Sequence, residues 1–211
     1  MRKEIQSQSK KAACFLRAFR PSGPINLVAI HPITGKTVGI TCPVTDTAFY
    51  QFIEQYNGTS NLYFMVNTPF SDAPDKKLKK EHVEFINAVW LDADPDKNKP
   101  FDKERERLLT FVNQLKEGKN APTYIVDSGG GYQAFWVFEN PMPATSDSIR
   151  LYEGASRGLA EKYNTDKVQN IDRIMRIPYT LNIPTAKKKG RKKAWSKVFY
   201  ATSKEGVRYA G

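Results

Sequence analysis

The sequence feature that most constrains the fold is an apolar run that ends in closely spaced acids and is stopped by a proline, Ala88-Val89-Trp90-Leu91-Asp92-Ala93-Asp94-Pro95-Asp96. Its composition predicts a β-strand, in which Asp92 and Asp94 share one face with Trp90 at a spacing of about 7 Å. Two such carboxylates can bind one divalent cation or a pair about 3.5–4 Å apart. Without a cation, a proton or a basic partner they repel each other. The run predicts either a metal site or, because Asp and Pro favour turns, a turn at Asp94-Pro95-Asp96.

Length and composition favour a chain that folds without covalent staples. It has 211 residues, of which 40% are hydrophobic. We expect a flexible N-terminus over residues 1–11 and a folded core over 12–211. Cys14 and Cys42 are too few for a disulfide framework or a zinc site, so no zinc is expected. No apolar stretch approaches the roughly 20 residues that span a bilayer, so we expect a cytoplasmic protein with no membrane partner.

The charge of the chain predicts a polyanionic partner. Lys and Arg number 33 against 22 Asp and Glu, a net charge of +11, and nucleic acid is the leading candidate. The charge is densest in a basic stretch, residues 187–197, which contains Trp195 for possible base stacking. The basic residues that we expect to bind nucleic acid there are Lys187, Lys188, Lys189, Arg191, Lys192 and Lys193. The alternative is a solvated loop with no partner.

Periodicity and turn residues predict a mixture of helices and strands. We expect helices over residues 12–19, 47–56, 76–84, 102–117 and 146–163, the second capped by Asp46 or Thr45 and the fourth by Asp102. We expect strands over 25–30, 36–41, 61–67, 88–94, 123–127, 132–138 and 198–201, with a short apolar and basic segment over 174–178. Two hairpins follow, over 25–41 and 123–138.

Two further segments combine residues that suit phosphate chemistry. The turn Ser128-Gly129-Gly130-Gly131 could let backbone N–H groups approach a phosphate, or could be only a flexible connection. Gln133 follows this turn. It is either a polar residue that shares a strand face with apolar Phe135 and Val137 beside the turn, or simply a polar residue at the solvent end of the strand. Beyond it, Asp172 could bind metal while Arg173 and Arg176 clamp phosphate oxygens, or Asp172 and Arg176 could form an internal salt bridge.

Together these segments resemble the archaeo-eukaryotic primase superfamily, in particular the primase-polymerases of phages, plasmids and integrated elements. Leu91-Asp92-Ala93-Asp94 is similar to the first motif of the family. The glycine turn and strand of residues 128–136 are similar to the second, and residues 170–178 to the third. The segment 61–67 also resembles the strand that precedes the first motif. The resemblance covers roughly residues 12–200.

The resemblance implies an α+β fold, with a mainly antiparallel, RRM-like catalytic sheet beside an N-terminal α/β part. It implies that two Mg²⁺ or Mn²⁺ ions are held by Asp92, Asp94 and Asp172. It implies that the triphosphate of a dNTP or NTP is positioned by Ser128, Gly131, Gln133, Arg173 and Arg176. The activity implied is that of a DNA primase and DNA polymerase on a single-stranded DNA template or primer, with a replicative helicase as a candidate partner.

The sequence departs from the family pattern at three positions. Gln133 stands where the second motif usually carries a histidine, and an amide can donate to a phosphate but carries no positive charge. Tyr179 stands where a glycine is expected after the third motif. Asp166 competes with Asp172 for the role of third acid.

Two other functions use the same residue types. A non-enzymatic module that binds single-stranded DNA or a replication origin would need the basic surface but no metal. A metal-dependent nuclease would use the same acids, because two-metal sites both cut and join phosphodiesters. A histidine-dependent relaxase is disfavoured, because the only histidines are His31 and His82 and no His-x-His pair exists.

Overall fold

The computed structural model describes residues 2–185, 188 and 191–202. In chain order its elements are α1 (Arg2–Phe19), β1 (Pro24–Ile30), β2 (Thr37–Pro43), α2 (Thr47–Tyr56), β3 (Asn61–Met65), β4 (Thr68–Pro69), the 3₁₀ helix η1 (Lys80–His82), β5 (Val83–Ala93), α3 (Phe101–Glu117), β6 (Tyr124–Asp127), β7 (Tyr132–Pro143), α4 (Ser146–Tyr163), β8 (Ile174–Arg176), β9 (Leu181–Asn182), β10 (Ala194–Trp195) and β11 (Lys197–Ala201).

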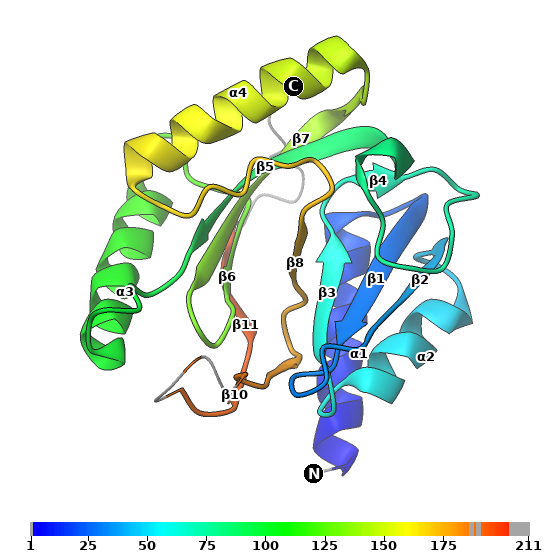
Figure 1. Ribbon diagram of the computed structural model, residues 1–211, viewed down its shortest axis with the longest axis horizontal. Coiled ribbons are helices and arrows are strands. Elements are labelled where there is room, and N and C mark those ends of the chain that lie inside the picture. The colour runs from blue at the N-terminus through cyan, green and yellow to red at the C-terminus, as the bar shows by residue number, and fades with distance from the viewer. Residues whose placement is uncertain (1, 186–187, 189–190, 203–211) are drawn as a thin grey trace.

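Two sheets form the body of the described chain. One has the strand order β2-β1-β3-β8, the other β11-β6-β7-β5-β4, and β9 pairs with β10 in a small third sheet. All of these strand pairs are antiparallel. Figure 1 shows α1 and α2 with the four-stranded sheet on the right, and α3 and α4 with the five-stranded sheet on the left. The predicted α+β fold with antiparallel sheets and both predicted hairpins are confirmed.

Strand β5 has the alternation that its sequence predicts. Trp90 is fully buried in the main core, and its indole N–H donates to the carbonyl of Val168 at 3.0 Å. Leu91 and Ala93 point to the other face, where they pack in a second cluster with Leu108 of α3. Because burial holds both faces, the register of β5 cannot slip without exposing one apolar set.

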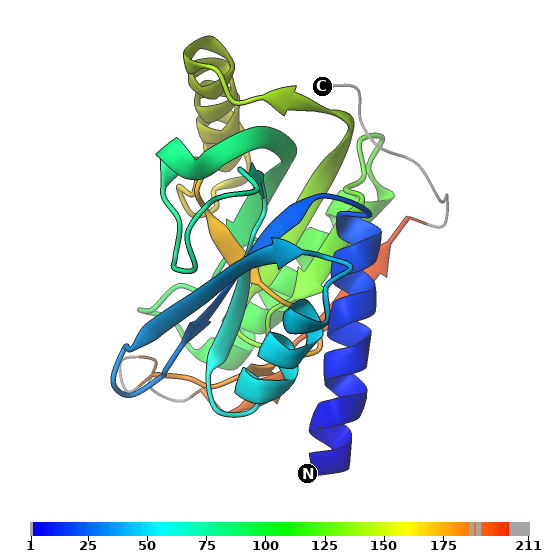
Figure 2. The same cartoon turned by 90° about the vertical axis from the view of Figure 1, so that its right-hand side faces the viewer.

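Helix α1 fills the space between the two sheets with aromatic side chains. The ring of Phe19 lies 5.2 Å from that of Phe64 on β3 and 5.5 Å from that of Phe135 on β7. Figure 2 shows α1, in dark blue, running along one side of the molecule. The helix begins at Arg2, so residues 2–11 are its first turns rather than the separate flexible segment that their polar composition suggested. Ser9 is already buried, where its hydroxyl accepts from Asn57.

Two local predictions were wrong. The charged segment 76–84 forms only the short helix η1, because Val83 and Ile86 are drawn into β5 and the lysines before them offer no apolar stripe. Asp102 does not cap α3 but lies in its first turn, after Pro100. Among the described residues, no helix is long and apolar enough to cross a membrane.

Candidate active site

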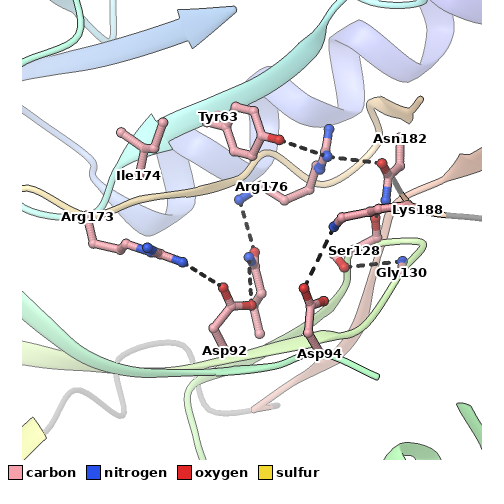
Figure 3. A pocket seen from close by; sticks show the side chains of 11 residues that line it. Tyr63, Asp92, Asp94, Ser128, Gly130, Arg173, Ile174, Arg176, Asn182 and Lys188 are labelled. Carbon is pink, nitrogen blue, oxygen red and sulfur yellow. Dashed lines mark hydrogen bonds and ion pairs between the residues drawn. The ribbon is translucent and has the colours of Figure 1, made fainter. Parts of the chain in front are cut away.

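The acids at the end of β5 point into a pocket between the two sheets, with a cavity volume of about 170 Å³. Figure 3 shows Asp92 and Asp94 on one side of this pocket and Arg176 on the other. The lining residues are Tyr63, Asp92, Asp94, Ser128, Gly130, Gln133, Arg173, Ile174, Arg176, Asn182 and Lys188. The pocket therefore unites residues from all three predicted motifs.

Asp92 is held by two donors and sits in an environment that disfavours its charge. Its Oδ1 accepts from Gln133 Nε2 at 3.3 Å and its Oδ2 from Arg173 Nη2 at 3.1 Å. Burial, and then the neighbouring charge of Asp94, raise the pKa of Asp92 from 3.8 to about 6, although Arg173 and Gln133 act in the opposite direction. A bound cation would relieve both effects that raise this pKa.

Asp94 lies at the solvent-exposed edge of the pocket, and Lys188 Nζ is 3.7 Å from its Oδ2. Its position depends on Gly131. A Cβ atom at Gly131 would lie 2.7 Å from Asp94 Oδ1 and 2.3 Å from the carbonyl oxygen of Ala93. Only glycine allows this close approach of the turn to the acid strand.

Arg176 on β8 is a buried cation surrounded by neutral partners. Its guanidinium donates to Asn61 Oδ1 at 2.9 Å, to Asn182 Oδ1 at 3.1 Å and to the hydroxyl of Tyr63 at 3.2 Å. It also stacks over the Tyr63 ring at 4.6 Å. Burial lowers the pKa of Arg176. No carboxylate forms an ion pair with it in the described part of the chain, so the predicted alternative of a salt bridge with Asp172 is not formed. A buried cation without a paired acid favours an anionic ligand.

Gln133 lies at the base of the pocket rather than at the solvent end of its strand. It is 6% exposed and stands directly opposite Asp92 in the β5–β7 register. Its amide donates to Asp92, and its carbonyl oxygen accepts from the backbone N–H of Arg176 at 3.0 Å. The side chain therefore links the two sheets.

The glycine turn supports the site through its shape. Gly129 has a φ of +77°. Its N–H donates to Asp127 Oδ1, and those of Gly130 and Gly131 donate to Ser128 Oγ. The predicted presentation of backbone N–H groups to a phosphate is not seen, because all three glycine N–H groups have partners inside the turn.

The structure does not bring the predicted third acid to the pocket. Asp172 is absent from the lining, whereas the backbone N–H of Asp166 donates to the carbonyl of Asp92 at 3.0 Å. Burial and the charge of Asp94 raise the pKa of Asp166, so its carboxyl lies within electrostatic reach of Asp94. Within the described ranges, no group of three or more potential metal-binding side chains is assembled. Asp92 and Asp94 nevertheless fit Mg²⁺, which commonly uses one or two carboxylates and completes its shell with phosphate and water.

Part of the basic stretch reaches the pocket. Lys188 lines it, and the guanidinium of Arg191 stacks over Phe101 at 5.2 Å, with Nη1 beside Gly130. The other predicted nucleic-acid ligands are Lys192 and Lys193, which are exposed, and Lys187 and Lys189, which lie outside the described residues.

Sequence reasoning missed the residues that hold Arg176. Asn61, Tyr63 and Asn182 come from β3 and β9, and none was a candidate ligand. The available signal was polar side chains in otherwise apolar, buried strands, which need a specific partner.

No protein-family model matches the sequence, and no curated protein does. The structure, in contrast, has the fold of a primase catalytic domain. It is similar to the crystal structure of the primase RepB', with a TM-score of 0.56 and 15% identity over 93% of this chain and 57% of that one. It is also similar to the catalytic domain of RepB' in complex with initiator DNA, with a TM-score of 0.55 and 14% identity over 93% of this chain and 87% of that one. This likeness confirms the fold that the primase resemblance implied. The chain spans little more than half the length of the first of these structures.

Proposed function

We propose that the chain is a DNA primase and DNA polymerase that catalyses template-directed, divalent-metal-dependent nucleotidyl transfer. One observation carries the proposal: a pair of carboxylates, the largely buried Asp92 and the more exposed Asp94, faces the buried Arg176 across one small pocket, and no described acid forms an ion pair with that arginine. The acids suit a divalent cation and the arginine suits a phosphate. A nucleoside triphosphate with its metal presents both charges together.

The acid side would hold Mg²⁺ or Mn²⁺ through Asp92 and Asp94. When bound, such an ion supplies the charge that lowers the pKa of an attacking hydroxyl and neutralises a leaving pyrophosphate. Arg173 and Lys188, whose side chains are 40% and 45% exposed, pair with these carboxylates and would turn toward phosphate oxygens when a metal replaces them. Asp172 has no place in this arrangement.

The arginine side would position the triphosphate. Arg176 is immobilised by its three hydrogen-bond partners, so little side-chain entropy is lost when it binds an anion. Lys192 and Lys193 outside the pocket would hold the backbone of single-stranded DNA without reading its sequence. The likeness to a RepB' domain that was crystallised with initiator DNA supports this partner.

The test is to incubate the protein with single-stranded DNA, labelled dNTPs or NTPs and Mg²⁺ or Mn²⁺, with and without a primer. An Asp92→Ala/Asp94→Ala variant serves as the control. Metal-dependent products longer than the input, absent with the variant, would support nucleotidyl transfer, and products without primer would support priming. DNA that is bound but unchanged would support the binding-module alternative, and shortened DNA the nuclease.

A further inference from the structure

The Gln133 side chain bonds to both the strand that carries the acids and the strand that carries Arg176. Nε2 donates to Asp92 Oδ1 at 3.3 Å on β5, and Oε1 accepts from the backbone N–H of Arg176 at 3.0 Å on β8. Strand β5 belongs to the five-stranded sheet and β8 to the four-stranded sheet. The amide is therefore a bridge between the sheet that carries the acids and the strand that carries the arginine.

Both ends of this bridge are specified by chemistry. The N–H of Arg176 can only donate, so it requires the carbonyl oxygen of the amide. The NH₂ group then necessarily faces Asp92 and the sulfur of Met175, which lies 3.5 Å from Nε2. The backbone of Gln133 is held in the middle of the sheet, because it pairs with Asp92 on one side and with Val126 on the other. A group used in this way has little freedom to contact a nucleotide.

We infer that Gln133 is a positioning residue, which sets the placement of Asp92 relative to Arg176, rather than a ligand of the triphosphate. The inference rests on the proposed function and deepens it. It requires that loss of the bridge weakens the metal site and the phosphate site together. A direct nucleotide ligand would weaken only the second.

The chemistry also explains why glutamine can stand at this position in place of a histidine. A neutral imidazole has one N–H donor and one acceptor nitrogen, the same pair of functions that the amide provides. A methionine has nearly the volume of glutamine but cannot make either strong hydrogen bond. Gln133→Met therefore removes the bridge with little change in packing, and Gln133→His can restore it.

The experiment measures Mn²⁺ binding without nucleotide or DNA, from the electron paramagnetic resonance signal of free Mn²⁺, and then binding of a fluorescent dNTP. The proteins compared are wild type, Gln133→Met, Gln133→His and Asp92→Asn. Asn26→Leu is the matched control, since Asn26 is also buried and joins three backbone and side-chain acceptors on β2 and the segment after β4, but does not line the pocket. Thermal unfolding is recorded for every variant.

We expect Gln133→Met to bind both Mn²⁺ and dNTP about tenfold more weakly than wild type, and Gln133→His to bind both within about threefold of wild type. Asn26→Leu should lose thermal stability without losing Mn²⁺ affinity. If Gln133→Met binds Mn²⁺ as wild type does while Asp92→Asn does not, the positioning role is overturned. If wild type and Asp92→Asn bind Mn²⁺ equally poorly, it is the proposed metal site that fails.

Discussion

The two sides of the pocket handle charge in opposite ways. On the acid side, Asp92 and Asp94 are paired with Arg173 and Lys188, whose side chains are 40% and 45% exposed. On the arginine side, Arg176 is 6% exposed, and its hydrogen-bond partners among the described residues are all neutral. A metal can replace exposed cations at little cost in free energy, whereas the charge of a buried arginine is compensated only when an anion binds. The contrast indicates a site in which the acids have replaceable counter-ions and the arginine, in the part of the chain that the structure describes, has none.

The largest effect is expected from removing charge on the acid side. Asp92→Asn keeps the shape of the side chain and its carbonyl acceptor but loses the charge that would hold a metal. We expect primer extension to fall about a thousandfold, which corresponds to the several kcal/mol that a metal contributes to such a transition state. The measurement is the extension rate at saturating Mn²⁺. A variant that retains more than a tenth of the wild-type rate would contradict the assignment of Asp92.

The pH dependence of the free energy of unfolding should report the cost of keeping Asp92 charged in the folded chain. Asp92 has a pKa of about 6 in the folded chain against 3.8 without burial, so the native state binds this proton more tightly than the unfolded state. Protonation of Asp92 therefore contributes up to about 3 kcal/mol to the free energy of unfolding. This contribution is fully present below about pH 4 and is lost as pH rises through 6. We expect Asp92→Asn to be more stable than wild type at pH 7.5, with the difference shrinking toward pH 4.5.

Chemical denaturation of both proteins at several pH values measures this difference, and saturating Mn²⁺ should reduce it at pH 7.5. A stability difference between the two proteins that does not change between pH 4.5 and 7.5 would show that burial does not raise the pKa of Asp92.

A smaller effect is expected when the arginine side is given its own counter-ion. Asn182→Asp keeps the acceptor for Arg176 but adds a negative charge that competes with a phosphate. We expect dNTP affinity to fall at least tenfold, while Mn²⁺ affinity is kept. Asn182→Ser is the neutral control, because it also loses the donor to the Ser128 carbonyl but adds no charge. Equal dNTP affinity of the two variants would show that the missing counter-ion is not what attracts the phosphate.

The smallest effect is expected at Tyr179, which follows the arginine strand. Its φ of +64° is a left-handed conformation that disfavours any residue with a Cβ by about 1–2 kcal/mol. Tyr179→Gly relieves this strain but loses core packing and the contact of Lys11 Nζ, 5.9 Å from the ring centroid. We expect the free energy of unfolding to stay within about 1 kcal/mol of wild type.

Urea denaturation measures this balance, with Tyr56→Gly as a control. Tyr56 is a partly buried ring of the same core without a positive φ, so its loss has no relief of strain to offset it. Equal destabilisation by the two substitutions would show that Tyr179 is not strained.

The acid side was predictable from the sequence because its determinants are local. The alternation of apolar residues in 88–93 and the glycine turn within a hairpin need only neighbouring residues, and the second half of β5 and the β6–β7 hairpin lie where those patterns predict. The first half of β5, from Val83, was not predicted. The expectation of glycine at position 179 came from the family resemblance, and the positive φ there shows its physical basis.

Only the tertiary structure decided the arginine side. Strand β8 pairs with β3 over more than a hundred residues of chain, which places Arg176 among Asn61, Tyr63 and Asn182. No period in the sequence encodes such a pairing, because it depends on which apolar edges remain free after the local hairpins have formed. For the same reason, the sequence predicted Asp172 for the pocket, whereas the structure brings in Lys188 and places the backbone of Asp166 against Asp92. Local periodicity determines which face a side chain occupies, and long-range packing determines what that face meets.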